Sequence, residues 1–421
     1  MQLSTSPQVP SQPAAKVVAG CAQQAQRAAP TLARAAEKDI DAALQAMAQR
    51  LTASAETVLA ANAEDVAAAE QSGMTAALVD RLRLGDARLA EMAAQLELLA
   101  GVPFPPRDQV IEDRPDGLRL IERRCPVGVV GATFEARPNV TVDVASQLVK
   151  SRNAGVLRTG SAALRSALAL RAEVIAPALA DAGLDPDAIA LVADPRRDSA
   201  LALVAQPGLI PLVIVRGSGE TTRALAAEGA RHGVRVLAHA DGGGVLYVDA
   251  AADPALAVEL LVAGLDRLGV CNRVNLLLVA EDAPAGLYDQ LLDAAGRAGV
   301  GVSLPPHDHR LGHEWALDAG REATLTVSRA AGAGAAARLA NHETSGLAAT
   351  IVTGDPAAAQ EFLDSYTGTG AFWNASTRLL DGFKLRHVPE TGINVDRVPG
   401  PRGPVTFQDL YLRQFVVVPI R

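Results

Sequence analysis

The sequence predicts an α/β protein built on mostly parallel sheets, and three observations lead to that prediction. Between about residues 127 and 240, short apolar runs alternate with segments whose apolar residues recur every three or four positions. A second region with the same alternation begins near residue 244. The chain of 421 residues is too long for one ordinary domain, and its 49% hydrophobic residues allow a large core. Alternating strands and helices imply right-handed crossovers and sheets covered on both faces.

Composition argues against several classes of protein. A net charge of −8 does not suit a nucleic-acid surface, and no apolar run reaches the ~18 residues of a membrane span. Residues 1–13 carry no positive charge and no apolar core, so we expect a short disordered lead there and not a signal peptide. The cysteines are far apart and odd in number, which fits a reducing cytoplasm: Cys21, Cys125 and Cys271.

The elements are expected in the following order. Residues 14 to about 100 are helical and look like scaffold, with no obvious chemistry. Residues 110–124 predict a β-hairpin that turns at Asp116-Gly117. Such a ribbon is marginal alone, and the apolar C-terminal strand at 414–420 has no obvious partner in its own region. We therefore expect that strand to pair with the hairpin of another subunit.

Strands and helices then alternate. The first α/β region is expected to hold strands at 127–133, 154–158, 189–192, 209–215 and 234–238, and helices at 140–150, 161–178, from 199, and 221–228. The second is expected to hold strands at 246–248, 274–279 and 350–352, helices at 255–268, 285–298 and 357–365, and a poorly patterned stretch to residue 336. Ligands bind at the carboxyl ends of such strands, which singles out the loops 135–139, 158–160 and 216–219.

A lone cysteine follows a Gly-Val step in Leu268-Gly-Val-Cys-Asn272, ahead of the apolar run at 274–279. Gly269 allows close backbone approach, so the Cys271 thiol could lie at the bottom of a cleft. A thiolate is a strong nucleophile once nearby positive charge lowers its pKa. Residue type alone favours the alternative of a buried structural cysteine. The other motifs of the chain favour the nucleophile instead.

Three strand ends carry further candidates. Arg216-Gly-Ser-Gly219 opens a helix with small residues that let backbone N–H groups reach a phosphate, although a simple turn explains it equally well. Arg158 is either a ribose-phosphate ligand or a solvated side chain. Asn139 is either a donor to an oxyanion or a helix N-cap.

The histidines carry two more candidates. His239, ahead of Asp241-Gly-Gly-Gly244, is either an acid/base group or a hydrogen-bonded loop histidine. His307-Asp-His309 and His313 have a spacing like that of metal ligands. No Cys or Glu pattern completes that set, so we expect no metal.

Taken together, these segments resemble the gamma-glutamyl phosphate reductases (glutamate-5-semialdehyde dehydrogenases) of the aldehyde dehydrogenase superfamily. The resemblance runs from about residue 36 to residue 413. Its most specific segments are Glu135-Ala-Arg-Pro-Asn-Val-Thr141, Gly269-Val-Cys-Asn272 and Asn374-Ala-Ser-Thr-Arg378. Others are Asp80-Arg-Leu-Arg-Leu84, Pro126-Val-Gly-Val-Val130, Glu390-Thr-Gly-Ile393 and Arg402-Gly-Pro404.

The resemblance implies an aldehyde dehydrogenase-like α/β fold in three parts. These are a Rossmann-type NADPH-binding domain at 1–109 and 127–243, an α/β catalytic domain at 244–397, and a small β oligomerisation element at 110–126 and 398–421. It also implies a cytoplasmic homo-oligomer, dimer or tetramer, with no nucleic-acid or membrane partner. Such an enzyme would serve proline biosynthesis beside a glutamate 5-kinase-like enzyme.

The resemblance also assigns roles to residues. Cys271 would be the nucleophile, Asn139 and the Cys271 amide would hold the oxyanion, and His239 stands where aldehyde-oxidising relatives carry a general-base glutamate. The cofactor NADPH would be contacted by Arg158, Thr159, Gly160, Arg216, Gly217, Ser218 and Glu322. The acyl phosphate substrate would be contacted by Arg137, Asn272, Arg273, Asn374, Ser376, Thr377 and Arg378.

The implied reaction is the NADPH-dependent reduction of L-glutamyl 5-phosphate, or a close analogue, to glutamate 5-semialdehyde through a cysteine thioester. Reduction needs no deacylating base, which agrees with His in place of Glu at 239. The sequence departs from the family where Leu347, Ala349 and Asn275 replace polar or acidic groups. These departures favour a paralogue reducing a different acyl phosphate, and they leave open an NAD(P)-dependent aldehyde dehydrogenase or an inactive homologue.

Overall fold

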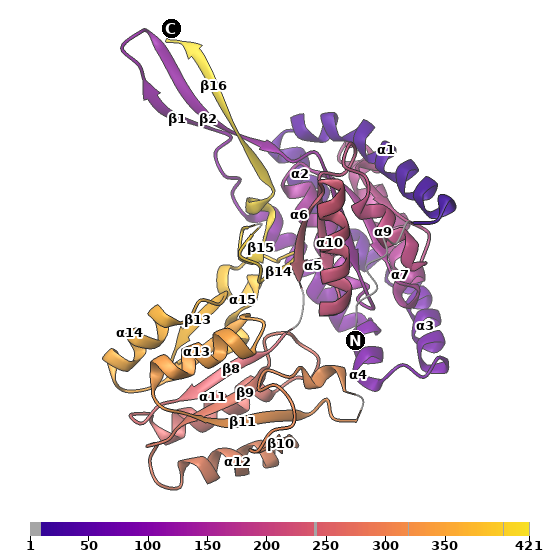
Figure 1. Cartoon of the computed structure of the whole chain (residues 1–421). Helices are drawn as coiled ribbons and strands as arrows, with labels where there is room; N and C mark the ends of the chain where they lie inside the picture. The colour runs from indigo at the N-terminus through magenta and orange to yellow at the C-terminus, as the bar shows by residue number, and fades with distance from the viewer. Residues whose placement is uncertain (1–9, 240–241, 319, 399, 421) are drawn as a thin grey trace.

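The computed structural model describes residues 10–239, 242–318, 320–398 and 400–420. Residues 1–9 of the expected disordered lead, and Asp241, lie outside this description. Two α/β parts lie next to each other, and a narrow β-ribbon projects from the first of them (Figure 1). Among the described residues, no helix is both long and apolar enough to cross a membrane.

The first α/β part is a parallel sheet with strand order β5-β4-β3-β6-β7. Its strands are β3 (Val129–Phe134), β4 (Ala154–Thr159), β5 (Ile189–Leu191), β6 (Leu212–Arg216) and β7 (Arg235–His239). The chain order reverses between β3 and β6, and at such a point loops diverge and leave a crevice at the carboxyl ends of the strands. The residues that follow these two strands are therefore placed for ligand binding.

Helices cover both faces of this sheet, because alternate strand residues face opposite sides. Apolar residues of α2, α5 and α6 pack on one face, and those of α1, α9 and α10 on the other. The helices are α1 (Gln12–Arg34), α2 (Glu37–Ala53), α3 (Ala55–Gln71), α4 (Ala76–Leu82), α5 (Asp86–Gly101), α6 (Asn139–Lys150), α7 (Leu164–Ala169), α8 (Ala176–Asp181), α9 (Arg197–Val204) and α10 (Gly219–His232). Short helical turns are η1 (Ser161–Ala163), η2 (Leu170–Ile175) and η3 (Pro186–Ala188).

A buried ion pair joins α6 to the N-terminal helices. The fully buried Lys150 ammonium donates to Asp41 Oδ1 at 2.7 Å and to the Ala100 carbonyl at 3.2 Å, and it lies 4.0 Å from the centre of the Phe104 ring. A buried charge is tolerated only when it is paired in this way. The pair therefore fixes α2 and α5 against the helix that begins at Asn139.

The second α/β part is also parallel, with strand order β10-β11-β9-β8-β12-β13. Helices α11 and α12 cover one face, and α13 and α14 the other. The strands are β8 (Gly244–Val248), β9 (Val274–Ala280), β10 (Gly301–Ser303), β11 (Thr324–Ala330), β12 (Ala348–Val352) and β13 (Gly370–Trp373). The helices are α11 (Pro254–Leu265), α12 (Leu287–Arg297), α13 (Ala333–Glu343), α14 (Pro356–Ser365) and α15 (Gly382–Arg386), with turns η4 (Trp315–Leu317) and η5 (Thr377–Leu379).

The stretch that showed little pattern contains two of these strands, β10 and β11. Strand β11 reads Thr-Leu-Thr-Val-Ser-Arg-Ala, so polar residues break up its apolar run. Thr326 is nevertheless fully buried, because its hydroxyl accepts a hydrogen bond from the Trp315 indole at 2.9 Å. A polar side chain with a partner can lie inside a sheet, and the sequence does not show that partner.

The projecting ribbon is an antiparallel sheet of β1 (Asp108–Asp113), β2 (Leu118–Pro126) and β16 (Tyr411–Pro419). Gly117, at φ +82°, makes the expected hairpin turn. Strand β16 pairs with β2 from Tyr411 opposite Pro126 to Pro419 opposite Leu118. The expectation that this strand pairs with another subunit's hairpin is therefore wrong, because its partner is the hairpin of its own chain. A short pair, β14 (Gly392–Asn394) and β15 (Gly403–Val405), and the turn η6 (Phe407–Asp409) precede β16.

Candidate active site

Two cavities meet at Cys271. The larger, of about 610 Å³, follows the carboxyl ends of β3 and β6, and the smaller, of about 350 Å³, lies between the two α/β parts. Both are lined by Arg81, Arg137, Arg216, His239, Gly269, Val270 and Cys271. The thiol that the sequence singled out is therefore placed where a ligand in one cavity can meet a ligand in the other.

Glycines allow the loop that carries this thiol to adopt its position. Gly269 has φ +73°, a conformation that costs other residues free energy. A methyl group on Gly242 would lie 2.6 Å from both the Cα and the carbonyl oxygen of Cys271, and the Gly243 N–H donates to that carbonyl at 2.8 Å. On the other side, the Thr377 hydroxyl donates to the Asn272 carbonyl at 2.8 Å. The loop that carries Cys271 is thus held between two other segments of the chain.

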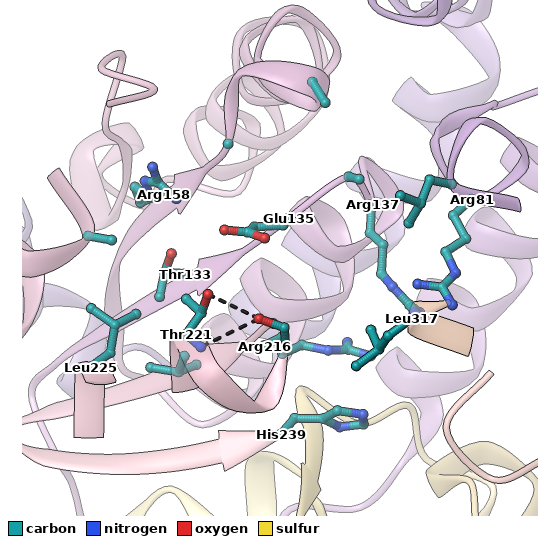
Figure 2. A pocket seen from close by; sticks show the side chains of 18 of the residues that line it. Arg81, Thr133, Glu135, Arg137, Arg158, Arg216, Thr221, Leu225, His239 and Leu317 are labelled. Carbon is teal, nitrogen blue, oxygen red and sulfur yellow. Dashed lines mark hydrogen bonds between the residues drawn. The ribbon is translucent and has the colours of Figure 1, made fainter. Parts of the chain in front are cut away.

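Three guanidinium groups surround the junction of the cavities. Figure 2 shows the side chains of Arg81, Arg137 and Arg216 extending toward the same end of the larger cavity, near His239. Arg81 comes from α4, Arg137 from the loop after β3, and Arg216 from the end of β6. Burial, reinforced by Arg216, lowers the pKa of Arg137 to about 10, so it stays charged at neutral pH. This cluster can hold an anion such as a phosphate or a carboxylate.

The same arginines act on the thiol. Burial raises the pKa of Cys271 above its ordinary value, while Arg137 and Arg216 pull it back down. In the ligand-free site the thiol form therefore predominates at neutral pH.

Asn139 begins α6 and lines the smaller cavity. Its Nδ2 donates to Asp143 Oδ2 at 2.9 Å, one turn further along the helix. Burial raises the pKa of Asp143 to about 6, so at neutral pH the carboxylate accepts this hydrogen bond. One amide proton of Asn139 is used by Asp143, and the other is left for a substrate oxygen.

The larger cavity joins the residues that follow β3, β4 and β6. Gly160, Arg216, Gly217 and Ser218 all line it, and Ser218 also caps α10 by accepting a hydrogen bond from the Thr221 N–H at 3.4 Å. The start of this helix therefore faces the crevice, as a phosphate site requires.

Arg158 also lines the larger cavity, but much of its guanidinium is already engaged. It donates to the Ser199 hydroxyl at 3.0 Å and to the Pro195 carbonyl at 2.8 Å. The exposed Arg197, at the start of α9, lines the same cavity. Arg158 thus orders the loop that presents Arg197.

Several residues expected at the site line neither cavity. Arg273 is buried and donates to the Thr324 carbonyl at 3.3 Å, and Thr159 is fully buried. Asn374 adopts φ +51° and donates from Nδ2 to the Thr353 carbonyl at 2.9 Å. The remaining residues of this group are Glu322, Ser376 and Thr377, of which Ser376 caps η5. The Asn374-Ala-Ser-Thr-Arg378 segment contacts the smaller cavity through Arg378, and Asn272 lines it as well.

Sequence reasoning missed other residues that line the site. Arg81, Asp143, Gly242, Glu314 and Glu390 come from five separate segments. Arg81 and Glu390 belong to segments that carried the family resemblance, and that resemblance was the signal from which they could have been identified as site residues. Burial raises the pKa of Glu390 to about 7, and its Oε2 accepts a hydrogen bond from the Gly382 N–H at 2.5 Å.

His307, His309 and His313, whose spacing resembles that of metal ligands, contact other side chains in the structure. His309 Nε2 lies 2.7 Å from the Ser303 hydroxyl, and the His309 and His313 rings each meet Trp315 edge-on. Within the described part of the chain, no group of three or more His, Cys, Asp or Glu side chains is arranged to hold a metal ion.

Comparison with known proteins shows the family to which the chain belongs. Residues 3–312 match the model of the aldehyde dehydrogenase family, and the chain belongs to that family. A gamma-glutamyl phosphate reductase from Rhizorhabdus wittichii is 39% identical over 95% of this chain and 94% of its own length. One from Chloroflexus aggregans is 38% identical over 92% of this chain and 94% of its own length. Both of these relatives are named gamma-glutamyl phosphate reductase.

Solved structures show the same fold. The gamma-glutamyl phosphate reductase of Thermotoga maritima superimposes with a TM-score of 0.85 at 28% identity, covering 95% of this chain and 98% of its own. An acetylating aldehyde dehydrogenase from Geobacillus thermoglucosidasius superimposes with a TM-score of 0.73 at 17% identity, covering 97% and 98% of the two chains. At that identity the second likeness concerns the fold alone.

Replacing Gly242 by Ala tests the backbone contact at the nucleophile. The new methyl group would displace Cys271, and a shift of about 1 Å in a reacting group can cost roughly 10²-fold in rate. We expect kcat to fall by about that factor while the circular dichroism spectrum stays unchanged. Gly208→Ala is the control, because no atom lies within 4 Å of a methyl group there. Full activity in Gly242→Ala would show that the contact is not needed.

The charge on Arg137 can be tested by alkylation of Cys271, in a background where Cys21 and Cys125 are replaced by Ala. Arg137→Met removes a cation that lowers the pKa of Cys271, so the thiolate fraction at pH 8 should fall and iodoacetamide should react more slowly. The pH dependence of the rate should also shift to higher pH. Lys384→Met, at the rim of the smaller cavity, should leave the rate unchanged. Equal alkylation rates in the parent protein, Arg137→Met and Lys384→Met would show that the charge on Arg137 does not lower the pKa of Cys271.

Proposed function

We propose that this protein reduces L-glutamyl 5-phosphate to glutamate 5-semialdehyde, with release of phosphate, through a thioester on Cys271. The observation that carries the proposal is the position of this thiol, where a cavity at a nucleotide-binding crevice meets a smaller charged cavity. Relatives that share more than a third of its residues over almost the whole chain are named gamma-glutamyl phosphate reductases.

The residues support acyl transfer in balanced steps. The Cys271 sulfur attacks the acyl carbon, the carbon–oxygen bond to phosphate breaks, and the thiol proton leaves with the phosphate as hydrogen phosphate. Asn139, whose amide Asp143 orients, can donate to the oxyanion of this step. A bound nicotinamide would supply the hydride that reduces the thioester. The resulting thiohemiacetal oxyanion collapses to the aldehyde and expels the Cys271 thiolate, which then takes a proton from solvent.

The charges of the smaller cavity suit an amino-acid acyl phosphate. Arg81, Arg137 and Arg216 are available to the phosphate and carboxylate groups, and Asp143 and Glu390 are available to an ammonium group. The residues that depart from the family pattern, Leu347, Ala349 and Asn275, line neither cavity. They therefore give no physical reason to prefer a different acyl phosphate.

The family implies a nicotinamide cofactor, and the larger cavity fits one. Its volume of about 610 Å³ lies within the range of ligand sites, and it opens at the switch point between β3 and β6. Gly217 and Ser218 would approach the pyrophosphate at the start of α10. We propose NADPH as the cofactor, with Arg197 and Arg158 near its extra phosphate.

The reverse reaction tests the proposed function. Purified protein should reduce NADP when given glutamate 5-semialdehyde and phosphate, and omitting phosphate should abolish the signal. The Cys271→Ala variant should be inactive under the same conditions. Turnover without phosphate would instead identify an aldehyde dehydrogenase that forms a free acid. No turnover with any aldehyde, by protein shown to be folded, would identify an inactive homologue.

Cofactor preference depends on Arg197 in this proposal. Replacing it by Ala should raise the KM for NADPH by roughly tenfold, because a charged hydrogen bond contributes about 1.5 kcal/mol. The KM for NADH should change little. Arg196→Ala is the control, since Arg196 pairs with Asp194 at 2.5 Å and does not line the cavity. Equal losses for both cofactors would remove Arg197 from the phosphate site.

We also propose that the projecting ribbon joins two copies of this chain. Its β1 and β16 edges are unpaired within the described residues, and Val110, Phe415 and Val417 are each more than 50% exposed. Exposed apolar edges of this kind favour association. The full-length protein should sediment as a dimer or a larger oligomer, and Phe415→Lys with Val417→Lys should shift it toward monomer. A wild-type monomer at micromolar concentration would refute this proposal.

A further inference from the structure

His239 is held by a backbone group that decides which of its nitrogens carries the proton. It ends β7 and lines both cavities beside Cys271. The backbone N–H of Ile393 donates to His239 Nδ1 at 2.6 Å. A backbone N–H cannot accept a hydrogen bond, so Nδ1 must carry a lone pair and no proton. The neutral ring therefore has its proton on Nε2.

The approach of β14 explains why this contact exists. Gly392 precedes Ile393, and a methyl group at 392 would lie 3.2 Å from the His239 Cβ and 3.4 Å from its Nδ1. Glycine at this position lets the strand come close enough for the next N–H to reach the ring. The Glu390-Thr-Gly-Ile393 segment thus acts on the histidine through its backbone.

The surroundings oppose a second proton on the ring. Burial lowers the pKa of His239 well below its ordinary value, and the positive charges of Arg216 and Arg137 act in the same direction. An imidazolium would also place an N–H at Nδ1 against the Ile393 N–H and lose that hydrogen bond. The ring is thus a neutral group with one donor to offer.

We propose that His239 is a neutral hydrogen-bond donor in which Nε2–H stabilises the oxygen of the acyl group on Cys271, and that it cannot serve as a general base. A base would need a lone pair on Nε2, and that lone pair requires the proton to move to Nδ1. The Ile393 N–H blocks that tautomer. Because no proton is taken from water, the thioester is left for the hydride. The catalytic part of this inference rests on the proposed function, whereas the tautomer does not.

The tautomer can be measured directly. Protein labelled with ¹⁵N-histidine should give an imidazole signal with a proton on Nε2 only at neutral pH, assigned to His239 by its loss in the His239→Gln variant. This reading does not depend on any substrate. A proton on Nδ1, alone or with Nε2, would overturn the inference even if the reductase activity is confirmed.

Two substitutions separate the roles of the two nitrogens. His239→Asn keeps an acceptor near Nδ1 for Ile393 but removes the distal donor, and His239→Gln keeps a distal amide donor. We expect kcat to fall by ~10²–10³-fold in the Asn variant, as for loss of an oxyanion donor, with KM little changed, and to fall much less in the Gln variant. Equal losses in both, or the reverse order, would overturn the donor role.

An esterase assay without cofactor tests whether His239 acts as a general base that activates water. With p-nitrophenyl acetate, wild-type protein should release one equivalent of nitrophenolate per active site and then nearly stop, because the acetyl thioester is not hydrolysed. The Cys271→Ala variant should give no burst. His239→Glu, which places a carboxylate where the neutral donor stood, should turn over continuously. Sustained turnover by the wild-type protein that is lost in His239→Gln would show that His239 activates water and overturn the inference.

Discussion

The backbone contact between Gly242 and Cys271 is the constraint on which the site depends. No side chain fits at 242, since a methyl group would lie 2.6 Å from the Cys271 Cα. The contact brings Gly242, just before β8, against the loop before β9, and it extends the parallel pairing of β8 with β9 toward the thiol. It thereby fixes the backbone of Cys271 where the two cavities meet.

Burial and positive charge act on the thiol in opposite directions. Burial raises the pKa of Cys271, and the guanidinium groups of Arg137 and Arg216 lower it. Acyl phosphate chemistry suits this balance, because the thiol proton can depart with the phosphate. Arg81, which also approaches the junction, comes from the N-terminal helices. These helices therefore contribute to the site as well as to the core, and the Lys150–Asp41 pair fixes them to the helix that carries Asn139.

Several polar side chains around the candidate site hydrogen-bond to backbone atoms that shape it. Asn374, Ser376 and Thr377 hydrogen-bond to neighbouring backbone atoms, and Arg158 orders the loop at 195–197. Side chains that shape a cavity wall and side chains that contact a ligand can occur in the same motif. The comparison with the Thermotoga maritima structure, at 28% identity, shows that the framework persists through extensive substitution.

The sequence by itself determined the α/β class and the order of most elements, because hydrophobic periodicity and turn signals are local properties. It singled out Cys271 and Asn139 as candidates because the segments around them resemble those of a known family. It did not reveal β11, whose burial depends on partners elsewhere in the chain, or the short edge strand β13, in which only Gly370 is buried. Only the tertiary structure decided that β16 pairs with its own hairpin, that Arg81 and Glu390 line the smaller cavity together with Cys271, and that Arg273 lines neither cavity. It also placed the Ile393 backbone N–H against His239 Nδ1, a hydrogen bond between residues more than 150 positions apart, and no local pattern records such a contact.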